Sequence, residues 1–236
     1  SIPGRELDGI LFAMEFLIDQ NRRNAGDAVA EEDRITAGGR NVGIIGGGDT
    51  GADCLGTCLR QGAQSVTQLE IMPKPPPTRD ESTPWPLWPY RLRSSSSHEE
   101  GGQRRWQVSA KEFIGKENKV SAVRVHSVNW IKKENGRMQP EEVPETEEMV
   151  PAELVLLAMG FSTEGNAEVL NRFGVQTSEK GEAVTDENRM TNVAGVFVAG
   201  DLSRGASLVV QAIADGREAA AGINHFLSAQ NESRQQ

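Results

Sequence analysis

Short apolar runs separated by glycine give the first part of the chain an alternating strand and helix pattern. A β-branched run at Val42–Ile45 predicts a strand, and a helix is expected to follow over Gly51–Gln61, where Gly62 ends it. A second strand-like run follows at Val66–Ile71. This order of strand, helix and strand predicts a parallel sheet of the doubly wound α/β class.

The pattern before the first strand predicts a helix over Ile10–Asn24. Its apolar positions Ile10, Met14, Leu17 and Ile18 recur at helical spacing. The residues ahead of it have a loop-like composition.

The middle of the chain changes to a β pattern. Strand-like alternation runs from Trp106 to Met149, and Asn135-Gly136 is a hairpin signal, so we expect an inserted antiparallel β-meander. The wholly apolar run Leu154–Gly160 then predicts a central parallel strand, buried on both faces and returning beside the strand Val42–Ile45.

The last 70 residues predict four more elements. They are a short helix at Ala167–Phe173, a short strand at Val184-Thr185, a buried strand at Val193–Asp201 and a long helix at Ser207–Leu227.

The first strand runs into a glycine cluster in which Gly46, Gly48 and Gly51 fit the G-x-G-x-x-G pattern of a dinucleotide-binding turn. The first glycine allows the tight turn, the second lets a pyrophosphate approach the backbone, and the third lets the helix pack closely on the strand. Helix N-terminal N–H groups favour phosphate. We therefore predict nucleotide binding by Gly46, Gly47, Gly48, Asp49, Thr50 and Gly51, against the alternative of a merely structural turn.

Charged residues after the second strand leave the choice of nucleotide open. Glu70 lies 22 residues beyond Gly48, near the spacing of about 20 expected for an acid that accepts a ribose 2′-hydroxyl of NADH. Lys74 and Arg79 follow closely and could bind the 2′-phosphate of NADPH instead. All three could also be solvated loop charges.

Two irregular stretches follow these charges. The proline-rich segments Pro73–Pro77 and Pro84–Pro89 predict a long, stiff loop that bears tryptophans and folds back on its own domain. The polar stretch Ser94–Gly102 is expected to be mobile, with His98 exposed.

Composition narrows the class of protein. The 236 residues carry a net charge of −9, which argues against nucleic acid or an anionic membrane as a partner, and no apolar run approaches the length of about 20 residues that a membrane span needs. Cys54 and Cys58 are interpreted as reduced, partly buried thiols of a cytoplasmic protein, with no metal site.

Several motifs together resemble a known family. The initial Ile2-Pro3-Gly4, the glycine loop, the run Ala158-Met159-Gly160 and the segment Val198–Asp201 resemble the flavoprotein oxidoreductases that have two dinucleotide-binding folds. Within that group, Gln68–Pro76 and the Trp-Pro pairs at Trp85 and Trp88 resemble the small (beta) subunits of bacterial glutamate synthases.

The resemblance implies an NAD(P)H-binding domain at residues 10–160 and the C-terminal portion of an FAD-binding domain at residues 161–236, with residues 1–9 as a linker. Only one glycine-rich nucleotide loop is present, and two cysteines cannot hold an iron–sulfur cluster alone. We therefore expect the chain to be a C-terminal fragment, with the first FAD loop and the iron–sulfur centres in a missing N-terminal region.

The same resemblance implies roles for residues near the end of the chain. Asp201 would accept a hydrogen bond from a ribityl hydroxyl of FAD, and Gly200 would allow its close approach. Backbone N–H groups near Ser207, Leu208 and Val209 would face the flavin edge, where a helix N-terminus suits negative charge. Met159 and Gly160 are predicted to contact cofactor, and no catalytic acid, base or nucleophile is predicted.

The implied function is the electron-input subunit of glutamate synthase, which oxidises NADPH and works with a large (alpha) subunit that forms glutamate from glutamine and 2-oxoglutarate. Cofactors supply this chemistry, and the protein supplies position and electrostatics. NADH is the alternative nucleotide. Alternative functions are the electron-input domain of another NAD(P)H flavoprotein and a nucleotide-binding module without a redox role.

Overall fold

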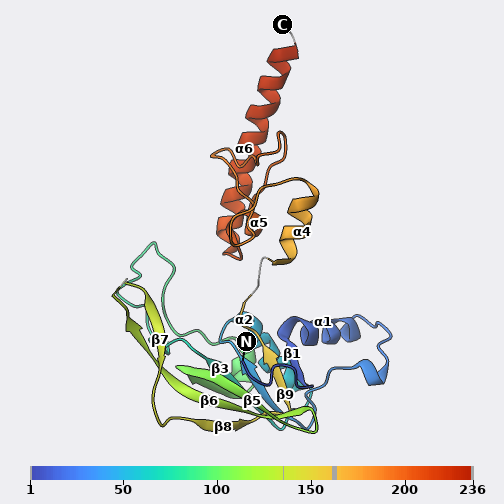
Figure 1. The fold of residues 1–236 in the computed structure, drawn as a ribbon, viewed down its shortest axis with the longest axis vertical. Helices are drawn as coiled ribbons and strands as arrows, with labels where there is room; N and C mark the ends of the chain where they lie inside the picture. Colours follow the sequence, from blue (N-terminus) through green and yellow to red (C-terminus); the bar gives the residue numbers. More distant parts are fainter. Residues whose placement is uncertain (1, 135, 161–163, 235–236) are drawn as a thin grey trace. The chain divides into compact units, whose positions relative to one another are not determined.

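The computed structural model describes every residue except 1, 135, 161–163 and 235–236 (Figure 1). The chain divides into two compact units, residues 1–160 and residues 161–236. Each unit is described by itself.

The first unit is built on a five-stranded, Rossmann-like sheet in which every neighbouring pair of strands is parallel. The prediction that the apolar run after residue 153 returns beside the glycine-loop strand is confirmed, because Val42–Ile45 pair with Leu154–Leu157. The strands lie in the order β1 (Ile10–Phe12), β9 (Leu154–Leu157), β2 (Asn41–Ile45), β3 (Ser65–Glu70) and β4 (Gln103–Trp106).

The central strand β9 is buried on both faces because its alternate side chains enter two different cores. Leu154 and Leu156 pack with the helices α1 (Ala13–Asn24) and α2 (Asp49–Arg60). Val155 and Leu157 point the other way and pack with the β-meander. The unit therefore has three layers, with helices, parallel sheet and meander stacked in that order.

The predicted antiparallel meander is confirmed. Its long strand β6 (Lys119–Lys132) pairs with β5 (Val108–Lys116) on one side and with β8 (Glu148–Pro151) and β7 (Met138–Glu142) on the other. The predicted Asn135-Gly136 turn falls between β6 and β7, but Asn135 lies outside the described residues.

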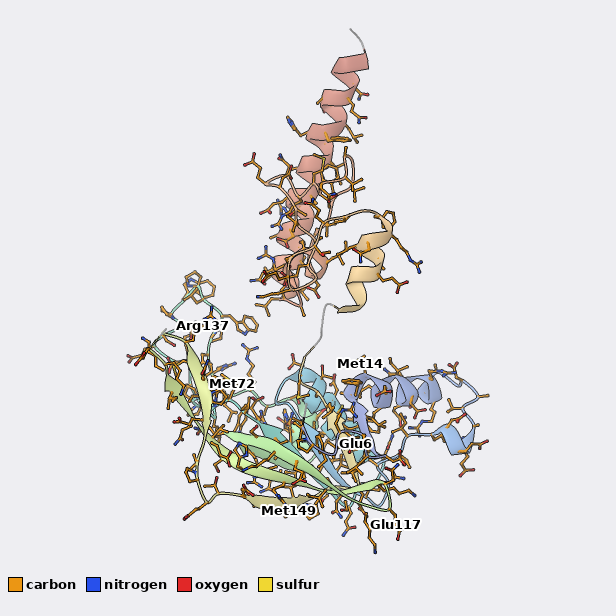
Figure 2. The ribbon with its side chains drawn as sticks, viewed as in Figure 1. Glu6, Met14, Met72, Glu117, Arg137 and Met149 are labelled. Atoms are coloured by element: carbon orange, nitrogen blue, oxygen red, sulfur yellow. The ribbon has the colours of Figure 1, made fainter. Side chains whose placement is uncertain are left out.

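The predicted helix over Ile10–Asn24 is wrong at its start. Ile10–Phe12 form the edge strand β1, paired with β9, and the helix begins only at Ala13. Its buried face is Ala13 and Phe16, whereas Met14 is 40 % exposed (Figure 2). The helical spacing gave a wrong prediction because Ile10 is buried as part of a paired strand and does not lie on the buried face of a helix. A short 3-10 turn, η1 (Glu31–Asp33), lies in the loop that follows.

The polar stretch Ser94–Gly102 is more ordered than predicted. It contains the short helix α3 (Ser96–Glu99) and leads into β4, which the pattern did not predict. The proline-rich loop before it closes on itself, since the backbone N–H of Leu92 donates to the carbonyl of Pro76 (2.6 Å) and the backbone N–H of Asp80 donates to the carbonyl of Tyr90 (3.0 Å).

The second unit contains α4 (Glu164–Arg172), α5 (Asp201–Arg204) and α6 (Val209–Arg234). The two strands predicted there are wrong, because Ala183 and Phe197 make only isolated bridges, to Thr177 and Met190. A strand needs a ladder of partners, and the described residues of this unit hold no sheet for either segment to join.

The two cysteines are free, as predicted, and fully buried in α2. Burial raises the pKa of the Cys54 thiol to about 12 and that of Cys58 further in the same direction. At pH 8 the reactive thiolate is then on the order of one part in 10,000. We expect the native chain to resist alkylation by iodoacetamide at pH 8, and the chain unfolded in guanidinium chloride to react at both thiols. Rapid labelling of the native chain would contradict this burial.

Candidate functional site

The glycine loop leaves β2 with the geometry that the sequence predicted. Gly46 has a φ of +123°, and a Cβ there would overlap the carbonyl group of Ala158. A Cβ on Gly51 would likewise collide with the carbonyl oxygen of Gly46. Both positions therefore require glycine for the turn and for the close packing of α2 on it.

The middle glycine is different, because a Cβ on Gly48 would meet nothing within 4 Å. Gly48 is the N-cap of α2, and no side chain caps this helix end. The N–H groups of the first turn, which includes Asp49 and Thr50, are therefore available to an anion, and the helix dipole favours one there.

Glu70 lies at the end of β3, beside the loop, as its position in the sequence suggested. Its Oε2 atom accepts the backbone N–H of Gly47 at 2.6 Å, and its Oε1 atom accepts that of Met72 at 2.7 Å. One carboxylate oxygen thus ties the glycine loop to the end of β3, and the other binds the backbone just beyond Glu70 itself.

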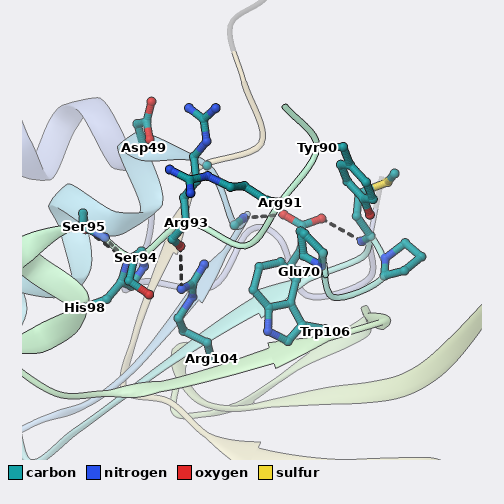
Figure 3. A pocket seen from close by; sticks show the side chains of 15 residues that line it. Asp49, Glu70, Tyr90, Arg91, Arg93, Ser94, Ser95, His98, Arg104 and Trp106 are labelled. Atoms are coloured by element: carbon teal, nitrogen blue, oxygen red, sulfur yellow. Dashed lines mark hydrogen bonds between the residues drawn. The ribbon is translucent and has the colours of Figure 1, made fainter. Parts of the chain in front are cut away.

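A cavity of about 510 Å³ opens between the glycine loop and the segment Tyr90–Trp106 (Figure 3). It lies at the carboxyl ends of the parallel strands, next to β2, where the order of strands reverses; open α/β sheets bind ligands at such points. Besides the loop and Glu70, its lining includes Tyr90, Arg91, Arg93, His98, Arg104 and Trp106.

Three arginines bring positive charge to this cavity, whose lining also includes the carboxylates of Asp49 and Glu70. Among the described residues, no carboxylate lies within ion-pair distance of Arg91, Arg93 or Arg104. Figure 3 shows the guanidinium groups of Arg91 and Arg93 close together. Unpaired arginines in a chain of net charge −9 indicate an anionic ligand.

Aromatic rings hold two of these arginines. The guanidinium of Arg93 stacks 4.1 Å from the ring centre of Trp88, and that of Arg104 lies 4.8 Å from the ring centre of Trp106. Nη1 of Arg104 also donates to the backbone carbonyl of Arg93 at 3.0 Å. Burial lowers the pKa of Arg104 from its ordinary value.

Lys74 and Arg79, which the sequence suggested for a 2′-phosphate, lie outside the lining of this cavity. Nη1 of Arg79 donates to the carbonyls of Thr83 (2.7 Å) and Leu87 (3.0 Å). The arginines that line it are more distant in sequence and reach it because the proline-rich loop turns back at Leu92. The feature of the sequence that could have pointed to them is the high frequency of arginine between Arg91 and Arg105.

A second cavity, of about 430 Å³, lies on the other side of the glycine loop. Gly46, Gly47 and Gly48 line it together with Met159 and Gly160, which follow β9. The loop therefore separates two cavities, and Met159 and Gly160 line one of them, consistent with the contact predicted for this pair.

His98 is not exposed as predicted. It is half-buried, its Nε2 atom lies 3.0 Å from Oε1 of Gln68, and its Nδ1 atom contacts the backbone N–H (3.1 Å) and Oγ (3.0 Å) of Ser95. Burial, assisted by the positive charge of Arg104, lowers the pKa of His98. The pattern missed this because Gln68, on β3, reads as an ordinary polar strand residue.

In the second unit, a cavity of about 470 Å³ brings together most of the residues predicted there. Gly200, Asp201, Ser207 and Val209 line it, at the N-terminus of α6, whereas Leu208 does not. Oδ1 of Asp201 accepts the backbone N–H (3.2 Å) and Oγ–H (3.3 Å) of Ser207.

The segment around Gly200 is fixed to α6 by a buried carboxylate. Asp215 is 1 % exposed and accepts from Arg204 of α5 and from Arg189. The hydrogen bond from Arg204 lowers the pKa of Asp215. Because a depressed carboxyl pKa stabilises the fold only above that pKa, this contribution is present at neutral pH and lost in acid.

The described part of the chain gives no indication of a metal site: no group of three His, Cys, Asp or Glu side chains there could hold a metal ion. Nor does any helix in the described ranges combine the length and apolar character required to cross a membrane.

Comparison with known proteins gives consistent results. Residues 6–216 match the sequence profile of the pyridine nucleotide-disulphide oxidoreductases. The chain is 51 % identical over 229 residues to the glutamate synthase (NADPH) small chain of Mycobacterium tuberculosis, which covers 96 % of this chain and 46 % of that protein. It is 38 % identical over 237 residues to the glutamate synthase (NADH) of Saccharomyces cerevisiae, covering 96 % of this chain and 11 % of that protein.

Solved structures show the same fold. The Mycobacterium tuberculosis oxidoreductase FprA matches with a TM-score of 0.69 at 16 % identity, over 99 % of this chain and 62 % of that one. The thioredoxin reductase of T. acidophilum matches with a TM-score of 0.56 at 20 % identity, over 94 % of this chain and 58 % of that one. The chain spans about half the length of the curated small chains that it matches.

Proposed function

Because the chain belongs to the pyridine nucleotide-disulphide oxidoreductase family, we propose that residues 10–160 bind NADPH for the electron-input subunit of a glutamate synthase. The proposal combines the family, the geometry of the glycine loop and the 51 % identity to a small chain named for NADPH. It concerns a part of that subunit, since the chain spans 46 % of this relative.

The observation that carries the choice of nucleotide is the group of three unpaired arginines beside the glycine loop. NADPH and NADH share a pyrophosphate, which the uncapped N-terminus of α2 would hold. They differ in the 2′-phosphate, which Arg91, Arg93 and Arg104 would bind by charge-assisted hydrogen bonds. The carboxylate of Glu70 is bound to the backbone N–H groups of Gly47 and Met72, whose partial positive charges offset part of its negative charge.

The nucleotide would span both cavities. Its adenosine end would lie among Tyr90, Trp106 and the arginines, and its nicotinamide end would enter the cavity lined by Met159 and Gly160. The aromatic rings offer stacking surfaces for the adenine. Of the residues predicted for this nucleotide, Gly46 to Gly51 and Glu70 stay in the proposal, and Lys74 and Arg79 are replaced by the three arginines.

The second unit supplies residues that fit part of an FAD site. In the described contacts only one carboxylate oxygen of Asp201 is used, so the other can accept a ribityl hydroxyl. Gly200 adopts a φ of +70°, which brings the backbone close to the cavity. When bound, FAD would supply the hydride-accepting chemistry, and Ser207, Val209 and the N-terminus of α6 would orient it.

For the whole protein we propose a part in the reaction in which glutamine, 2-oxoglutarate and NADPH give two molecules of glutamate, which the relatives named glutamate synthase (NADPH) small chain support. A large (alpha) subunit would be the partner, in the cytoplasm. Iron–sulfur centres would be held by residues outside this chain, since Cys54 and Cys58 are buried in the core of the first unit.

The test is a calorimetric titration of the chain with NADPH and, separately, with NADH. We expect NADPH to bind at least about tenfold more tightly, which is about 1.4 kcal/mol for the 2′-phosphate. Tighter binding of NADH would overturn the choice of nucleotide and make Glu70 the selecting residue. Binding of neither would contradict nucleotide binding by residues 10–160 of this chain.

A further inference from the structure

Two consecutive hydrogen bonds connect the polar stretch Ser94–Gly102 to the glycine loop. His98 contacts Oε1 of Gln68 through Nε2, at 3.0 Å, and Nε2 of Gln68 donates to the carbonyl of Gly46 at 2.9 Å. Gln68 is 1 % exposed, so its amide has no access to water and depends on these two partners.

The partners of His98 and Gln68 determine which atom donates and which accepts in each of these hydrogen bonds. The backbone N–H of Ser95 donates to Nδ1 of His98, so Nδ1 is an acceptor and the neutral ring carries its proton on Nε2. That proton is donated to Oε1 of Gln68, which leaves the amide NH₂ to face the carbonyl of Gly46. If the amide of Gln68 were turned the other way, its oxygen would face the carbonyl oxygen of Gly46, and neither could donate.

The carbonyl that receives the last bond sits at the turn of the nucleotide loop. Gly46 is the residue with the positive φ, and its carbonyl packs directly against Gly51 at the start of α2. Shifting this carbonyl would shift the N–H groups of the following turn. We propose that His98 and Gln68 are positioning residues that hold the glycine loop in its phosphate-binding conformation, an inference that rests on the proposed function.

The bonds act on the loop, which contacts the part shared by both nucleotides. We therefore expect His98→Phe and Gln68→Leu to weaken binding of NADPH and NADH by the same factor, about tenfold, because each leaves a buried polar group without its partner. The ratio of the two affinities should stay as in the original chain. His98→Gln keeps a donor for Gln68 and should retain binding to within about threefold.

The tautomer gives an independent readout. Long-range ¹⁵N–¹H correlation spectra at pH 7.5 should show His98 with its proton on Nε2. In a separate measurement, the conservative His98→Gln variant should keep the thermal stability of the original chain. The control is His225→Phe, which changes an exposed histidine in the second unit and should alter neither affinity.

Unchanged affinities in folded His98→Phe protein would overturn the inference, as would a ring proton on Nδ1. If Gln68→Leu fails to fold, His98→Phe decides, since its side chain is only half-buried. Failure of the proposed function looks different, because the unmodified chain would then bind neither nucleotide.

Discussion

Replacing both Arg93 and Arg104 with glutamine is expected to weaken NADPH binding about a hundredfold and to change NADH binding by less than about threefold. Each guanidinium would make a charge-assisted hydrogen bond to the 2′-phosphate, worth about 1.5–3 kcal/mol. Each single variant should therefore lower the affinity for NADPH about tenfold or more. Calorimetric titration of the three variants with both nucleotides measures the effect.

The matched control comes from the residues that the sequence pattern first suggested. Lys74→Gln removes the same charge from the neighbouring loop, but Lys74 does not line the cavity. We expect this control to bind NADPH within about twofold of the original chain at physiological ionic strength, because the exposed Lys74 side chain does not line the cavity. An equal loss of NADH binding in the arginine variants would show that they act on the shape of the site and not on the phosphate.

The difference between these two sets of residues shows what the sequence can predict. The conformations of Gly46 and Gly51 were predictable because backbone sterics within a few residues determine them. The position of Arg93 in the lining of the cavity was not predictable. It depends on where a proline-rich loop closes and on the stacking of Arg93 with Trp88. Closure of such a loop is a tertiary event that no local pattern encodes.

The errors in secondary structure have the same origin. Ile10–Phe12 fit a helical period, yet pairing with β9 makes them a strand. Val193–Asp201 has the composition of a buried strand, yet the described residues of the second unit offer it no sheet. In each case the tertiary partner, or its absence from the described residues, overrode local preference.

Changing Gly48 to alanine is expected to leave the fold intact and to weaken binding of NADPH and NADH more than tenfold. The φ of −79° and ψ of −174° at this residue suit alanine, and the new Cβ would meet no protein atom within 4 Å. An alanine N-cap typically costs the helix about 1 kcal/mol. The same Cβ would stand where the pyrophosphate must approach the loop.

Gly46→Ala provides the contrast, because its Cβ would overlap the carbonyl of Ala158 and its φ lies in the left-handed half of the map. We expect a loss of about 2–4 kcal/mol in the free energy of unfolding, from backbone strain and overlap together. Urea denaturation and calorimetric titration, applied to both variants, separate the two roles. Normal nucleotide binding by Gly48→Ala would contradict the proposed path of the pyrophosphate. Normal stability of Gly46→Ala would mean that the loop can take another conformation, and the case for a preformed phosphate site would then fail, because a loop free to move does not hold its N–H groups ready for an anion.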